Sequence, residues 1–167
     1  MALIFNKTVQ EALKEIESYQ YEEFTINYFQ PNQLESKHID NYAESKWKII
    51  EILNQNYSKA LKNEFDLYNW LYHYKEDEVA YFLNEAGSNA LNYSEFKTPS
   101  KFHLWLGSKG FLIGIEQQGR GFNAVKINQD KIKENEGAAF EFYRNCKSIV
   151  FFDNPEEARI VYLVYLF

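Results

Sequence analysis

Asn84-Glu-Ala-Gly-Ser-Asn-Ala-Leu-Asn-Tyr93 and Glu116-Gln-Gln-Gly-Arg-Gly-Phe122 are the two stretches that predict the fold of this chain. In a helix, Glu85 and Asn89 lie one turn apart on the same side. The second stretch ends an apolar strand in Gly-x-Gly, where the backbone can approach a ligand closely. In this order and spacing, the two stretches predict a nucleotide pocket.

Apolar residues around the first stretch repeat at helical spacing and define a core face: Val79, Phe82, Leu83, Ala86 and Ala90. At 100° per residue, Glu85 and Asn89 fall beside this face and not opposite it. The acidic segment 75–78 before them suits a helix N-terminus. We therefore expect Glu85 and Asn89 at the rim of a groove.

The composition limits the possible classes of protein. At 167 residues, 46% of them hydrophobic, the chain is long enough for one domain with its own core. Its formal charge of -6 argues against a nucleic-acid partner, which needs clustered Lys and Arg. The single cysteine, Cys146, indicates an inert buried thiol. Neither a membrane span nor a secretory signal is apparent, so we expect a cytoplasmic protein that does not bind membranes.

The N-terminal half of the chain predicts two helices and a strand. Thr8-Val-Gln-Glu11 is a capping-box pattern that begins a short helix within residues 1–21. Residues 24–29 alternate between apolar and polar side chains and are rich in strand formers, and Pro31 ends this predicted strand. A long amphipathic helix is predicted over residues 39–61 from its apolar stripe, which consists of Ile39, Ala43, Trp47, Ile50, Leu53, Tyr57 and Leu61. Residues 63–75 are aromatic and fit either a short helix or an irregular connection.

The C-terminal half predicts two hairpins separated by a lid and a helix. The first hairpin joins residues 102–106 and 111–115. Residues 123–136 are polar with little apolar periodicity, so we expect a mobile lid. A helix opens at Gly137, and the second hairpin comprises residues 148–152 and 159–167. The fold class expected from this order is α+β, a two-layer α/β sandwich with a mixed, mostly antiparallel sheet and helices on one face.

The order of three motifs resembles the GHKL (Bergerat-fold) ATPases, a superfamily that includes gyrase, Hsp90, histidine kinases and MutL. The motifs are Glu85-Ala-x-x-Asn89-Ala90, Gly119-x-Gly121 and the glycine that opens a helix at Gly137. The first motif is most similar to the asparagine box of the bacterial anti-sigma-factor serine/threonine kinases. The resemblance covers residues 22–167, which would form one histidine-kinase-like ATPase domain.

The resemblance implies a role for each motif. Asn89 would ligate Mg²⁺, which prefers oxygen ligands and shares its shell with phosphates. Glu85 would be the general base toward a water or a substrate hydroxyl. Gly119 and Gly121 would hinge the lid over ATP, and Gly137 would direct backbone N–H groups at phosphate. Phosphate charge could be neutralised by several cations among which the sequence does not choose: Arg120, Lys126, Lys131 and Lys133.

The chain departs from this family at three positions. Gln117 stands where the family has the aspartate that reads adenine, although a glutamine carbonyl can still accept from the amino group. Ala139 replaces the second glycine of the phosphate-binding box, and its methyl group would crowd the phosphates. Tyr93 stands where His or Arg is common. These changes fit either a divergent ATPase or a pseudoenzyme.

The sequence leaves several alternatives open. Glu85 and Asn89 also fit an ordinary polar pair at a helix edge, and Gly119-x-Gly121 fits a simple turn. We expect either an Mg-ATP-binding domain that phosphorylates or sequesters a regulatory partner protein, or a non-catalytic interaction module that has lost nucleotide binding. A third possibility is an unrelated α+β protein. The N-terminal helix fits an arm for homodimerisation as well as a helix packed on its own domain. Three residues show no metal spacing: His38, His73 and His103.

Overall fold

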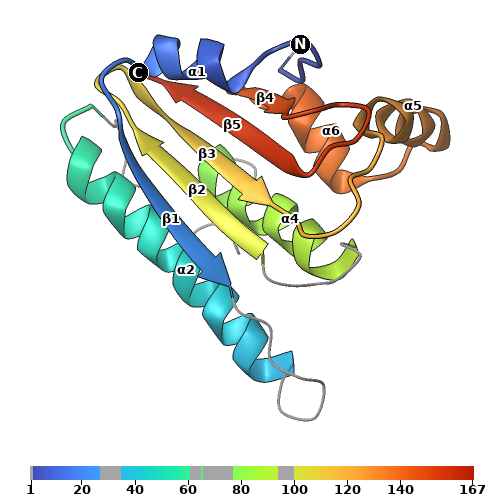
Figure 1. The fold of residues 1–167 in the computed structure, drawn as a ribbon, viewed down its shortest axis with the longest axis horizontal. Coiled ribbons are helices and arrows are strands. Elements are labelled where there is room, and N and C mark those ends of the chain that lie inside the picture. The colour runs from blue at the N-terminus through green and yellow to red at the C-terminus, as the bar shows by residue number, and fades with distance from the viewer. Residues whose placement is uncertain (1, 27–34, 61–64, 66–76, 94–99) are drawn as a thin grey trace.

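A five-stranded sheet forms the centre of the molecule in the computed structural model, and helices pack on it (Figure 1). The structure describes residues 2–26, 35–60, 65, 77–93 and 100–167. The elements follow in the order α1 (Val9–Ile16), β1 (Gln20–Ile26), α2 (Glu35–Tyr57), α4 (Glu78–Tyr93), β2 (Ser100–Leu106), β3 (Gly110–Glu116), α5 (Ala124–Glu134), α6 (Ala138–Asn145), β4 (Ile149–Phe152) and β5 (Ile160–Leu166). The protein is therefore of the α+β class, as predicted.

The strands are arranged in the order β1-β2-β3-β5-β4, and each neighbouring pair is antiparallel. The expected first hairpin is confirmed, since Leu106 of β2 pairs with Phe111 of β3. The second hairpin, β4–β5, pairs Phe152 with Val161. A mixed sheet was expected, but the described strands show no parallel pair; only an isolated bridge between Leu3 and Val150 is parallel.

Most of the core lies between one face of the sheet and the layer formed by α2, α4 and α6. Phe82 of α4, Leu53 of α2 and Leu104 of β2 are fully buried there. The expectation that helices cover a single face needs one correction. α1 packs on the opposite face, where Ala12 and Ile16 meet a smaller cluster formed by Leu112, Phe151, Tyr162 and Val164. This packing buries the apolar edge of the short amphipathic helix.

The structure confirms the short N-terminal helix that the capping-box pattern predicted. The Thr8 hydroxyl accepts a hydrogen bond from Glu11 N at 3.2 Å, and the Glu11 carboxylate accepts from Thr8 N at 2.8 Å. These two reciprocal bonds form the predicted capping box. Because α1 packs on its own domain, its apolar edge is not left open as a dimerisation arm.

Two predicted segments differ from the structure at their ends. β1 begins at Gln20, four residues before the predicted strand, and the predicted residues 27–29 lie outside the described part of the chain. α2 begins at Glu35 and ends at Tyr57, whereas the predicted helix ran from 39 to 61. The segment that the sequence left open, residues 63–75, also lies outside the described residues, apart from Phe65.

The expected lid is a helix. In α5 the Asn123 side chain accepts from Lys126 N at 2.8 Å and caps the first turn. Ala124 is fully buried, and its backbone N–H donates to Pro155 O at 2.8 Å. On α6, Arg144 Nη1 donates to Asn128 Oδ1 at 2.8 Å and ties the two helices together. The predicted lack of apolar periodicity fits a helix that buries little of its surface.

Candidate functional site

Helix α4 carries Glu85 and Asn89. Its first turn is capped by Asp77, whose carboxylate accepts from Ala80 N at 3.0 Å. All five residues of the predicted core face are buried: Val79, Phe82, Leu83, Ala86 and Ala90. Glu85 and Asn89 are half-buried beside this face. Both side chains therefore lie beside the core face, as the helical phasing predicted, but only Asn89 lines the hollow described below.

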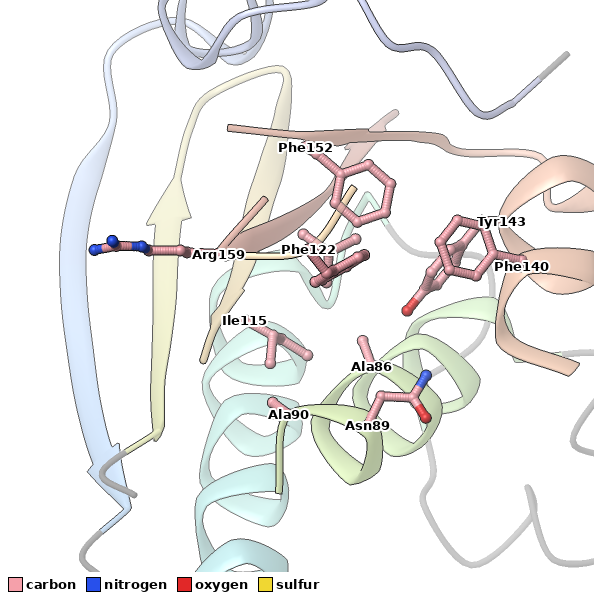
Figure 2. Close-up of a pocket in the computed structure, with 10 residues that line it drawn as sticks. Ala86, Asn89, Ala90, Ile115, Phe122, Phe140, Tyr143, Phe152 and Arg159 are labelled. Carbon is pink, nitrogen blue, oxygen red and sulfur yellow. The ribbon is translucent and has the colours of Figure 1, made fainter. Parts of the chain in front are cut away.

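A small hollow lies next to Asn89, between α4, α6 and the ends of three strands (Figure 2). It is lined by Ala86, Asn89, Ala90, Ile115, Phe122, Phe140, Tyr143, Phe152, Arg159 and Val161. Its volume is about 40 Å³. That is room for ordered water but far below the roughly 300–1,000 Å³ of a small-molecule site. In this conformation aromatic rings occupy the space that a nucleotide would need.

The two polar residues of α4 differ in their relation to the hollow. Asn89 lines its edge, and no residue that the structure describes forms a hydrogen bond with the Asn89 carboxamide. Glu85 is not among the lining residues, but its negative charge adds to the effect of burial in raising the pKa values of Tyr143 and Tyr42. Asn89 is thus available to a ligand at this edge. The charge of Glu85 is close enough to affect Tyr143, which also lines the hollow.

Gln117 closes a turn of its own segment. Its Nε2 donates to Arg120 O at 3.2 Å, and its backbone N donates to Arg159 O at 2.9 Å. Gly119 in the same turn has a φ of 93°, a conformation that favours glycine. Gln117 is not among the lining residues of the hollow. The structure therefore does not bring Gln117 together with Asn89.

Gly121 lies against another part of the chain. A Cβ atom at this position would collide with the backbone carbonyl of Glu157 in the β4–β5 connection. Next to it, Phe122 N donates to Ala158 O at 3.0 Å, and Ala158 N donates to Phe122 O at 2.8 Å. Another group does approach the Gly121 backbone closely. That group is the Glu157 carbonyl of the same chain.

Gly137 is the N-cap of α6 with a φ of 89°, and none of the described side chains caps this end of the helix. The positive φ favours glycine at this position, whereas a Cβ there would meet only the flexible side chain of Lys131, at 2.8 Å from its Cδ. Lys131 itself is paired with Glu134 at 2.9 Å and with Glu136 at 3.7 Å. Of the cations proposed for phosphate, Lys131 is thus already partnered, and Lys126 and Lys133 are exposed.

Four aromatic residues of the hollow carried no functional signal in the sequence: Phe122, Phe140, Tyr143 and Phe152. For the two on α6, the apolar spacing of Ala139, Phe140 and Tyr143 on one side of the helix could have predicted burial. The arginine in the lining, Arg159, directs its guanidinium group away from the hollow (Figure 2). The hollow is therefore mainly apolar, with polar atoms from Asn89 and Tyr143 at its boundary.

The remaining predicted residues have structural roles. His103 is buried on the opposite face of the sheet, where Nδ1 lies 2.8 Å from the Tyr21 hydroxyl and Nε2 lies 2.7 Å from Glu116 Oε2. Cys146 is half-buried where a buried thiol was expected, and burial raises the pKa of this thiol to about 12, which disfavours the reactive thiolate. Among the described residues, no group of three or more His, Cys, Asp or Glu side chains could hold a metal ion.

The comparisons with known proteins leave the family of this chain open. No known protein-family model matches the sequence, and no curated protein is significantly similar to it. In the described part of the chain, no helix is long and apolar enough to cross a membrane.

Proposed function

We propose that this chain is a divergent adenine-nucleotide-binding domain resembling the GHKL ATPases, and that it acts in the cytoplasm on a partner protein. The observation that carries the proposal is the position of Asn89 at the edge of an apolar hollow between α4, α6 and the end of β3. β3 leads directly into the Gly119-x-Gly121 turn. The proposal is supported by the fact that Asn89 lines the hollow and that two elements lining it, β3 and α6, adjoin the Gly119-x-Gly121 turn and Gly137.

In this proposal the base occupies the hollow and the phosphates extend past Asn89. Asn89 would hold Mg²⁺ through its carboxamide oxygen, and Mg²⁺ would neutralise phosphate charge. A single protein ligand fits this cation because phosphates and water complete its shell. Glu85, one turn away, would accept the proton of a hydroxyl group on the partner protein. The chain would then phosphorylate that partner, or sequester it, as the anti-sigma kinases do.

A second candidate function is a non-catalytic interaction module that kept the fold and lost the nucleotide. The specific observation in its favour is the volume of about 40 Å³, since the rings of Phe122, Phe140 and Phe152 fill the space beside Asn89. Two groups proposed for the nucleotide also have partners within the chain: Gln117 Nε2 donates to Arg120 O, and Lys131 is paired with carboxylates of its own segment. Nucleotide binding therefore requires an aromatic ring to move.

Calorimetric titration with Mg-ATP tests the proposal. We expect wild-type protein to bind and Asn89→Ala to lose binding. Asn145→Ala is the matched control, because Asn145 is exposed at the end of α6 and does not line the hollow. Phe122→Ala removes a half-exposed ring from the lining and should increase the affinity. If neither wild-type protein nor Phe122→Ala binds Mg-ATP, the nucleotide-binding proposal is refuted, and the interaction module and an unrelated α+β protein are the functions left to test.

A further inference from the structure

The Tyr143 hydroxyl is a buried polar group without a hydrogen-bond partner in the part of the chain that the structure describes. Tyr143 is only 3% exposed, and no residue that the structure describes forms a hydrogen bond with its hydroxyl. Two other buried tyrosines do have such partners, because Tyr42 donates to Leu83 O at 2.6 Å and Tyr57 donates to Gly107 O at 2.9 Å. Leaving a buried hydroxyl unpaired costs free energy, so most such groups have a partner.

The hydroxyl points into the hollow beside Asn89 (Figure 2). Its ring is held by neighbouring aromatic rings, with centroid distances of 5.5 Å to Phe140, 6.1 Å to Phe82 and 6.3 Å to Phe152. The direction of the hydroxyl is therefore fixed by packing. Burial, together with the charge of Glu85, raises the pKa of Tyr143 well above its ordinary value, so the group stays protonated and can both donate and accept.

We infer that the Tyr143 hydroxyl hydrogen-bonds the nucleobase of the ligand that enters this hollow. The inference rests on the proposed function and assigns to Tyr143 the base contact that the sequence had suggested for Gln117. The lining of aromatic and aliphatic side chains suits the flat faces of a purine. One fixed hydroxyl at the boundary of an apolar site is the kind of polar group that sets a ligand's orientation.

A purine needs more room than the hollow offers in this conformation. Phe122 is the aromatic residue of the lining that is half-exposed, whereas Phe140 and Phe152 are buried. Its backbone is fixed by the two hydrogen bonds to Ala158, so its side chain can turn without moving the chain. The Phe122 ring is thus the part that moves when the base enters, and Tyr143 keeps its position.

Tyr143→Phe tests the inference, because it removes only the hydroxyl. In the ligand-free protein we expect an unchanged or higher melting temperature, since an unpaired buried group is lost. With ligand, the affinity for Mg-ATP should fall about fivefold to tenfold, the cost of one hydrogen bond, whereas the affinity for inorganic triphosphate with Mg²⁺ should not change. Tyr165→Phe, outside the lining, is the matched control.

The possible results separate the two proposals. If wild-type protein binds Mg-ATP and Tyr143→Phe binds it equally well, the base contact is refuted and nucleotide binding stands. A lower melting temperature of ligand-free Tyr143→Phe also overturns the inference, because the hydroxyl would then have a structural partner. If wild-type protein binds neither Mg-ATP nor triphosphate, the proposed function fails together with the base contact.

Discussion

The hydroxyl of Tyr42 on α2 occupies the space that a side chain at Gly87 on α4 would need. It donates to the carbonyl oxygens of Leu83 at 2.6 Å and Asn84 at 3.0 Å, in the turn before Gly87. Glycine in the middle of a helix costs about 1 kcal/mol relative to alanine, so its presence here reflects the insertion of the tyrosine. This contact fixes α4 against α2 and thereby the direction in which Asn89 faces.

Gly87→Ala should destabilise the protein by about 1–3 kcal/mol, because the new methyl group overlaps the Tyr42 ring and hydroxyl. Urea unfolding measures the effect. In a Tyr42→Ala background the same substitution should be neutral or stabilising, since only the helix preference of alanine then remains. An equal loss of stability in both backgrounds would show that Tyr42 is not the cause.

Lys46 should make stability depend on pH in the alkaline range. Its Nζ lies 4.2 Å from the centroid of the Tyr42 ring and donates to Asn84 Oδ1 at 3.2 Å. Burial lowers the pKa of Lys46 from 10.5 to about 8. Below pH 8 the Lys46 amine is charged in the folded state, where its burial makes the charged form unfavourable. Between pH 8 and 10.5 only the unfolded state binds the proton, so the free energy of unfolding should rise with pH in this window.

Thermal unfolding of wild-type protein and Lys46→Met at several pH values between 7 and 10 isolates this contribution. We expect wild-type protein to gain stability relative to Lys46→Met by about 1–2 kcal/mol across the window, a discounted value because the amine is partly exposed to solvent. Lys48→Met, on the exposed side of α2, is the matched control. A difference between wild-type protein and Lys46→Met that stays constant with pH would contradict the prediction.

The sequence predicted most elements because their signals are local. The capping box at Thr8, the core face of α4 and the hairpin β2–β3 all depend on neighbouring residues, and all three are confirmed. The apolar stripe predicted for α2 was accurate only in part, with Ile50, Leu53 and Tyr57 buried as expected. Trp47 was expected in the buried stripe but is 37% exposed, whereas Tyr42 and Ile49 are buried. Apolarity alone favours tryptophan inside, but the insertion of Tyr42 opposite Gly87 sets the rotation of the helix.

The candidate site was predictable only in part. Asn89 and Glu85 lie where helical periodicity placed them. The neighbours of Gly121 and the hydroxyl of Tyr143 depend on pairings between distant segments, which periodicity does not encode. Without those pairings, a glycine that accommodates Glu157 cannot be distinguished from one that accommodates a nucleotide. The nucleotide roles of Gln117, Gly119, Gly121 and Gly137 therefore stay predictions.

Gly121→Ala should destabilise the ligand-free protein by roughly 1–3 kcal/mol, because its methyl group would collide with the Glu157 carbonyl in the β4–β5 connection. Chemical denaturation without nucleotide measures this loss. A glycine needed only for nucleotide contact would leave ligand-free stability unchanged and lower the affinity instead. Gly119→Ala, in which alanine must adopt a φ of 93°, tests conformational strain in the same turn, with an expected cost of about 1–3 kcal/mol.

Glu78 joins the start of α4 to the segment between α6 and β4, and its loss should be among the most destabilising of the acidic substitutions. Its Oε2 accepts from Lys147 N at 2.8 Å and Ser148 N at 3.1 Å, and its Oε1 accepts from the buried Ser148 hydroxyl at 2.8 Å. Hydrogen bonds to a charged group contribute about 1.5–3 kcal/mol, so Glu78→Ala should cost about 3 kcal/mol in urea unfolding.

The matched controls for Glu78 separate its hydrogen bonds from its charge. Glu156→Ala removes the same charge from an exposed turn and should change stability by less than about 0.5 kcal/mol. Ser148→Ala should cost about 1 kcal/mol alone and less in the Glu78→Ala background, because the two side chains share one bond. Full additivity of the two substitutions would mean that the carboxylate and the hydroxyl act independently and that the backbone N–H groups of residues 147 and 148 account for the effect of Glu78.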